Sequence, residues 1–216
     1  MAPVMRSACF ALAIAMLAPR AFGAELRAVV YDEAGAALAD AVVVAAPEGS
    51  APPAARPRAE QIEQIDLEFV PRVKAIQAGT AVSFPNRDKV RHHVYSFSAP
   101  KRFDLPLYAG TPPKPVLFDV PGVVTIGCNI HDWMVGYIYV SDSPYFAMSD
   151  AAGAARVELP PGRYVVRVWH PRLASPEAAT RRSIEVGQGG ASLEWRLALK
   201  PEISVRRPAA GRGSKY

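Results

Sequence analysis

Three side chains that bind soft metal ions lie close together in this sequence of 216 residues. The run from Cys128 to Met134 reads Cys-Asn-Ile-His-Asp-Trp-Met, with two residues between Cys128 and His131 and two between His131 and Met134. A thiolate, imidazoles and a long, weak thioether are the ligands of one class of protein copper site. The run therefore predicts a copper site, and other parts of the chain must supply a further ligand and a rigid scaffold.

The first 23 residues have the pattern of a secretory signal peptide. Arg6 precedes an apolar stretch at residues 7–18, and Ala21-Phe22-Gly23 places small residues before a cleavage site. This stretch is well short of the ~20 residues that a membrane-spanning helix needs. We therefore expect a periplasmic or otherwise exported protein with no membrane span. Cys9 leaves with the peptide, so Cys128 remains without a disulfide partner, which favours metal ligation.

Hydrophobic alternation predicts an all-β protein. Residues 163–169 and 192–199 alternate apolar and polar side chains, as half-buried strands do. The sequence contains 21 prolines, and no long stretch keeps an uninterrupted helical period. We expect helix to be limited to a turn or two near residues 174–180.

Two compositional breaks divide the mature chain. Residues 47–57 are rich in proline and alanine and predict a connector. Residues 141–144, Ser-Asp-Ser-Pro, come directly after an apolar strand and form the second break. Between them we expect a domain at residues 60–142. A basic tail at residues 201–216 is expected to be disordered, and its mild charge does not indicate nucleic-acid binding in an exported protein.

The middle segment contains two further histidines in a recurring context. A glycine turn at Gly79 leads to an apolar strand that ends in Asn86, and the pair His92-His93 follows. With the closing run at residues 127–138, this order and spacing resembles the cupredoxin family, the small blue copper proteins that include plastocyanin, pseudoazurin and amicyanin. The resemblance implies a Greek-key β-sandwich that holds one type 1 copper ion. The ligands that it implies are His92, Cys128, His131 and Met134.

Two adjacent histidines leave the first ligand open, because neighbouring residues on a strand point to opposite faces. Alignment with the family favours His92 as the ligand and places His93 where relatives often have an asparagine that holds the cysteine loop. The resemblance thus implies a shell around the ligands formed by His93, Asn129, Asp132 and Trp133. Within this shell, Asp132 would favour the more cationic state of the site. Trp133 is either a core aromatic residue or part of an apolar patch around His131.

The segments on either side carry a second resemblance. Residues 26–44 have the pattern of a first hairpin, and residues 149–153 and 159–168 that of later strands, in the carboxypeptidase regulatory-like, transthyretin-like sandwich. The resemblance implies one smaller sandwich, formed by residues 24–47 and 145–200, that is split by the inserted copper domain.

These features together favour electron transport by an exported copper protein. The resemblance to amicyanin implies a cytochrome c or an amine-oxidising dehydrogenase as redox partner. Motifs for a serine nucleophile, a zinc protease or a phosphate loop are absent from the sequence, and its four histidines are too few for a multicopper oxidase, so we expect no enzymatic activity. Two alternatives are a carrier of the copper ion itself and a structural binding module with a vestigial copper site. The presence of all four ligands and the small number of methionines favour electron transport.

Overall fold

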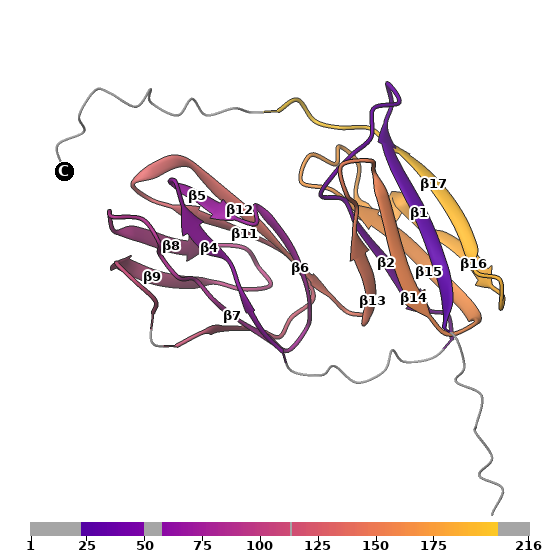
Figure 1. Cartoon of the computed structure of the whole chain (residues 1–216), viewed down its shortest axis with the longest axis horizontal. Helices are drawn as coiled ribbons and strands as arrows, with labels where there is room; N and C mark the ends of the chain where they lie inside the picture. Colours follow the sequence, from indigo (N-terminus) through magenta and orange to yellow (C-terminus); the bar gives the residue numbers. More distant parts are fainter. Residues whose placement is uncertain (1–22, 50–57, 113, 203–216) are drawn as a thin grey trace, which may run out of the picture.

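The computed structural model describes residues 23–49, 58–112 and 114–202, which form strands and one short 3-10 helix (Figure 1). The predicted all-β class is confirmed. The expected signal peptide at residues 1–23, the connector and the basic tail lie wholly or mainly outside the described residues. No helix within the described ranges is long and apolar enough to cross a membrane.

Residues 58–141 form a unit that we call the central sandwich. One of its sheets has five strands in the order β6-β12-β11-β8-β9, and another has three in the order β10-β7-β3. The hairpin β4-β5 completes it. The strands of the central sandwich are β3 (Ala59–Gln61), β4 (Glu63–Ile65), β5 (Glu68–Val70), β6 (Val73–Gln77), β7 (Thr80–Ser83), β8 (His92–Ser96), β9 (Phe103–Tyr108), β10 (Val116–Phe118), β11 (Gly122–Cys128) and β12 (His131–Ser141).

Residues 23–49 and 142–202 form a second unit, the flanking sandwich, which lies beside the first in Figure 1. Its elements are β1 (Ala24–Asp32), β2 (Val42–Pro47), β13 (Tyr145–Met148), β14 (Ala154–Leu159), β15 (Gly162–Trp169), the 3-10 helix η1 (Glu177–Thr180), β16 (Arg182–Val186) and β17 (Ala191–Leu197). Strand β1 pairs with β14 and β17, and β2 pairs with β13 and β15. Segments before and after the central sandwich thus share the same sheets. The exact domain boundaries and the resemblance of the flanks to a known family stay predictions.

Alternation along the strands places the core of the central sandwich. On β8, residues 92, 94 and 96 are fully buried and residues 93 and 95 are half-buried. On β12, Met134, Gly136 and Ile138 point inward in the same way. A Cβ on Gly136 would lie 3.1 Å from the Phe69 Cβ, so glycine allows β5 to pack closely on β12. Burial of these apolar side chains stabilises the sandwich by about 25 cal/mol per Å².

A buried charge network joins the two sandwiches. Arg167 of β15 donates from Nε to the Glu177 carboxylate at 2.9 Å and to the Tyr139 hydroxyl at 3.2 Å, and it forms an ion pair with Asp142. Tyr139, at the end of β12, also packs against the ring of Trp169 at a centroid distance of 5.6 Å. Because the network spans β12, β15 and η1, it fixes one end of the central sandwich to its neighbour.

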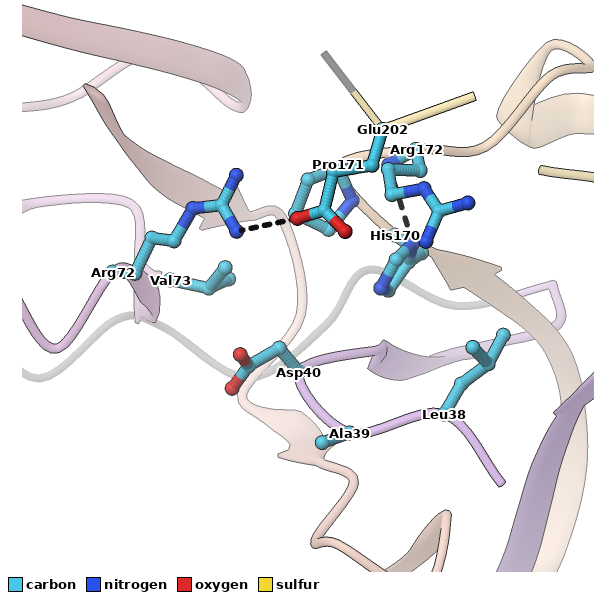
Figure 2. A pocket seen from close by; sticks show the side chains of 9 residues that line it. All are labelled: Leu38, Ala39, Asp40, Arg72, Val73, His170, Pro171, Arg172 and Glu202. Carbon is cyan, nitrogen blue, oxygen red and sulfur yellow. Dashed lines mark hydrogen bonds and ion pairs between the residues drawn. The ribbon is translucent and has the colours of Figure 1, made fainter. Parts of the chain in front are cut away.

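A cavity of about 180 Å³ lies between the two sandwiches, at the boundary that we call the seam (Figure 2). Arg72 and Glu202 face each other across it at 3.7 Å, and His170 and Asp40 lie on its wall. The Nδ1 atom of His170 accepts a hydrogen bond from the backbone N–H of Arg172 at 3.2 Å. His170 is thus hydrogen-bonded within the flanking sandwich while its side chain lines the cavity.

Candidate metal centre

Three neighbouring strands and one tight turn bring three side chains together. Strand β11 ends at Cys128, the turn Asn129-Ile130 follows, and β12 begins at His131. The ladder register shifts between Gly127 and Cys128, so that Cys128 stands opposite His131 across the turn. His92 opens β8, which pairs with β11 on its other side. Residues that are far apart in sequence are therefore held at one end of the five-stranded sheet.

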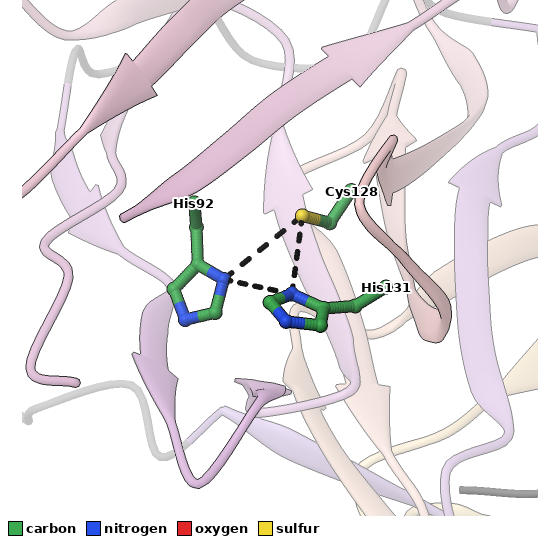
Figure 3. A group of neighbouring side chains, drawn as sticks. All are labelled: His92, Cys128 and His131. Atoms are coloured by element: carbon green, nitrogen blue, oxygen red, sulfur yellow. Dashed lines mark hydrogen bonds between the residues drawn. The ribbon is translucent and has the colours of Figure 1, made fainter. Parts of the chain in front are cut away.

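The three side chains point their ligand atoms at one another (Figure 3). The Nδ1 atoms of His92 and His131 are 3.2 Å apart, and the Cys128 Sγ lies 3.9 Å from the first and 3.6 Å from the second. Among the described residues, this is the one group of three or more such side chains whose atoms could hold a metal ion together.

These distances fit a metal ion. The point equidistant from the three atoms lies about 2 Å from each. Metal–nitrogen bonds are about 2.0 Å and metal–sulfur bonds about 2.3 Å, as in zinc sites. Without a metal, the thiol and the imidazole N–H groups can form only weak hydrogen bonds between these atoms, at 3.2 to 3.9 Å. A cation at the centre would be bound by all three atoms at once.

Burial and hydrogen bonding act against each other on the sulfur. Burial alone raises the pKa of the Cys128 thiol, since the charged form loses water. The bond with His92 and the backbone N–H groups of His93 and Ile130 outweigh burial, so that the net pKa is lowered. The site therefore favours the thiolate, which is the form that binds metals.

The two histidines have different surroundings. His92 is fully buried; burial lowers its pKa, but the hydrogen bonds to Cys128 and Asp88 outweigh this effect and raise the pKa. His131 is half-buried, and its pKa is lowered by burial and by the charge on His92. Beside it, Trp133 lies at a ring-centroid distance of 5.2 Å, and Ile130 is 49% exposed. His131 is therefore the ligand candidate nearest to solvent.

Met134, the fourth predicted ligand, lies in the same buried core as Cys128 and is only 1% exposed. It belongs to β12, three residues after His131, on the inward face of that strand. Its role as a weak axial ligand stays a prediction.

The residues that were expected around the ligands do not all lie beside the cluster of His92, Cys128 and His131. His93 turns to the other face of β8, where its Nε2 pairs with Asp104 and its ring packs on Tyr95. Its backbone N–H, not its ring, reaches the cysteine sulfur. Asn129 and Asp132 are exposed. The carboxylate that contacts a predicted ligand is instead Asp88.

Asp88 was not among the residues chosen from the sequence. Its Oδ2 lies 2.8 Å from the Nε2 of His92, on the side of the ring opposite the cluster. The sequence did contain one indication of this contact, since Asp88 precedes His92 by only four residues. However, those residues form a loop, and the contact depends on a turn that comes from another part of the chain.

No protein-family model matches the chain, and none of the curated proteins matches it. Three solved structures that are similar over part of the chain cover 38% of it each. A copper-containing nitrite reductase from Thermus scotoductus SA-01 is 27% identical at a TM-score of 0.35, and the match spans only 22% of that protein. A purple cupredoxin from Nitrosopumilus maritimus is 27% identical at a TM-score of 0.34, over 98% of its length. An oxidised amicyanin variant is 17% identical at a TM-score of 0.36, over 82% of its length.

Proposed function

We propose that this protein is an exported, mononuclear type 1 copper protein that carries single electrons between redox partners and is not an enzyme. The observation that carries the proposal is the triangle formed by the Nδ1 atoms of His92 and His131 and the Sγ of Cys128. Two imidazoles and one thiolate in a plane are the strong ligands of a blue copper centre. Met134 would add the long thioether bond.

The donor set favours copper over zinc. Structural zinc sites have four strong ligands, and a thioether contributes little to them. Bound copper supplies a reversible one-electron couple. The chain contributes rigidity, since Cys128 and His131 end two paired strands and His92 is held in the core beside them. Ligands that cannot move far limit the rearrangement that accompanies electron transfer.

The position of His131 supports a route for the electron. His92 is completely buried, whereas His131 is half-buried beside the exposed side chain of Ile130. A partner protein that docks on this end of the sandwich would approach the copper through the His131 ring. As partner we propose a cytochrome c or an amine-oxidising dehydrogenase, in the periplasm or another exported compartment.

The proposal is tested by adding Cu(II) to the purified mature protein. We expect an intense visible thiolate-to-copper charge-transfer band with one ion per chain, and its loss in Cys128→Ser. Adjacent histidines offer a matched pair of variants: His92→Gln should abolish the band, and His93→Gln should retain it. A colourless wild-type product, or a band that persists in Cys128→Ser, would contradict the type 1 assignment.

A second measurement distinguishes an electron carrier from a carrier of the metal ion. An electron carrier should show reversible one-electron voltammetry and should lose copper only slowly to a strong chelator. Rapid transfer of copper to the chelator, without a reversible couple, would instead favour metal delivery.

A further inference from the structure

The hydrogen bond between Asp88 and His92 decides which nitrogen of the ring is free. The distance from Asp88 Oδ2 to His92 Nε2 is 2.8 Å, and the Asp88 side chain is only 13% exposed. An ionised carboxylate can only accept hydrogen bonds, so His92 Nε2 must carry the proton. The Nδ1 lone pair is then directed at Cys128 and His131, as metal binding requires.

Asp88 is itself held by the turn between β4 and β5. The backbone N–H of Asp66 donates to its Oδ1 at 2.8 Å, and that of Leu67 donates to its Oδ2 at 3.0 Å. A third bond runs from the Asp88 backbone N–H to the side-chain oxygen of Asn86, at 2.9 Å. The carboxylate is thus fixed on both oxygens before it meets His92.

The turn adopts an uncommon backbone to provide these donors. Asp66 has φ 54° and Leu67 has φ 62°, which is the left-handed region that leucine rarely occupies. Neither residue is glycine, so the conformation must be maintained by its surroundings. The two consecutive N–H groups that it presents to Asp88 are part of what maintains it.

We propose that Asp88, held by the Asp66-Leu67 turn, is a positioning residue that fixes the tautomer and the direction of His92 and strengthens it as a copper ligand. The inference rests on the proposed copper site, because it assigns the role of Asp88 within that site. A carboxylate on the far nitrogen of a ligand histidine raises the basicity of the nitrogen that binds the metal.

An amide at position 88 cannot replace the carboxylate. Asparagine has one acceptor oxygen and one NH₂ group, whereas three N–H donors converge on Asp88. If the oxygen accepts from the turn, the NH₂ group faces His92 Nε2. That nitrogen must then be unprotonated, and the proton moves to Nδ1, where it blocks the metal.

The chain offers a matched control, because the neighbouring His93 has an aspartate partner of its own. Asp104 pairs with His93 Nε2 on the outer face of β8 and is 71% exposed. Asp88→Asn should weaken copper affinity about 10- to 100-fold, as loss of such partners does. It should also raise the reduction potential, because the more cationic Cu(II) state loses a nearby negative charge. Asp104→Asn should change neither quantity. Asp88→Glu, which keeps the carboxylate, should recover part of the affinity.

Nitrogen-15 NMR of the metal-free protein provides a readout that does not depend on copper. At a pH above the raised pKa of His92, where the ring is neutral, wild type and Asp104→Asn should show His92 protonated on Nε2, and Asp88→Asn should show the proton on Nδ1. A wild-type His92 that is protonated on Nδ1, or equal losses of affinity in the Asp88 and Asp104 variants, would overturn the proposal. The tautomer stays measurable if Asp88→Asn folds poorly, because the wild-type spectrum alone tests it. A protein that binds no copper but has the Nε2-protonated ring would refute the proposed function and leave the orienting contact in place.

Discussion

Two buried polar clusters lie at opposite ends of β12, and they differ in the kinds of group that face one another. At the Tyr139 end, Arg167 meets two carboxylates and a hydroxyl, so each charge has a partner of opposite sign or a hydrogen bond. At the His131 end, two imidazole nitrogens and a sulfur face one another at 3.2 to 3.9 Å. These atoms are mainly electron-pair donors, and such groups bind cations.

The contrast separates two reasons why polar groups are buried together: stabilisation of the fold and binding of a ligand. A cluster whose donors and acceptors balance is explained by the fold that it stabilises, as at Arg167. A cluster of converging lone pairs costs free energy in the folded protein unless something binds there. The first kind of cluster should therefore control stability alone, and the second should couple stability to a ligand.

The largest expected effect is stabilisation by metal at the Cys128 end. Binding to the folded state at a free Zn(II) concentration about 1,000-fold above Kd should raise the free energy of unfolding by about 4 kcal/mol. Zinc is a suitable probe because it does not oxidise the thiol. Thermal or denaturant unfolding of the wild type, of Cys128→Ser and of Arg167→Met measures it. The increment should vanish in Cys128→Ser and persist in Arg167→Met; an equal increment in all three proteins would refute the contrast.

The second largest expected effect is the loss of stability when the Arg167 cluster is broken. Arg167→Met removes the cation and leaves two carboxylates at the seam. We expect a loss of about 2–3 kcal/mol in the free energy of unfolding, which is below the value for a fully buried pair because the Asp142 and Glu177 side chains are 48% and 27% exposed. Urea unfolding measures the change. The visible band of the copper form should stay the same, and a variant as stable as wild type would contradict the assigned role.

A smaller change is expected for Met134→Leu, which conserves volume in the core. The cost should be below about 1.5 kcal/mol, because both side chains fill the same buried space. If the thioether binds copper weakly, its loss should keep the intense band and raise the reduction potential, since the axial ligand tunes that potential. Voltammetry of both proteins measures the shift. An unchanged potential would identify Met134 as core packing only.

The smallest effect is a pH dependence at the seam. Burial, followed by the charge of Arg172, lowers the pKa of His170 from its ordinary value of 6.5. The unfolded chain therefore binds the proton more readily, and the free energy of unfolding should fall as pH decreases below about 6.5 towards the folded pKa. His170→Gln should remove this contribution. Urea unfolding of both proteins between pH 7 and 5 measures the difference, and parallel curves would refute it.

In the metal-free protein, the pH dependence that His92 contributes to the free energy of unfolding should have the opposite sign. Its pKa is raised in the folded state, so its contribution is fully present below about pH 6.5 and is lost as pH rises through the folded pKa. Comparison of His92→Gln with wild type over the same range and above it tests this sign.

The sequence was sufficient for the class of fold and for the residues that form the cluster. Strand alternation indicated the all-β architecture, and local spacing in the loop from Cys128 to Met134 pointed to ligands on one tight turn. The strand period indicated that His92 and His93 point to opposite faces, and the resemblance to cupredoxins favoured His92, which β8 buries. Apart from that choice, these predictions depend on local geometry, which a sequence carries directly.

The role of Asp88 could not be predicted in the same way. It depends on a turn at Asp66 and Leu67 in which both residues are left-handed, a conformation that leucine rarely adopts. The Arg167 network likewise joins β12 to β15 and η1, which are distant in sequence. Both features are tertiary contacts between separate segments, and no spacing rule encodes them.

The pairing of β2 with β13 has a consequence for how the chain folds as it is made. Tyr145 lies opposite Ala45, and the Ser143 hydroxyl donates to the Ala45 carbonyl at 2.6 Å, so the flanking segments meet directly after the last strand of the central sandwich. Strands β1 and β2 precede the central sandwich in the chain, but their partners β13, β14, β15 and β17 follow it. The central sandwich is complete in between, and its folding brings the two ends together and shortens the loop whose closure the flanking sheets require. The copper-site unit is therefore expected to assemble before the sandwich that surrounds its ends.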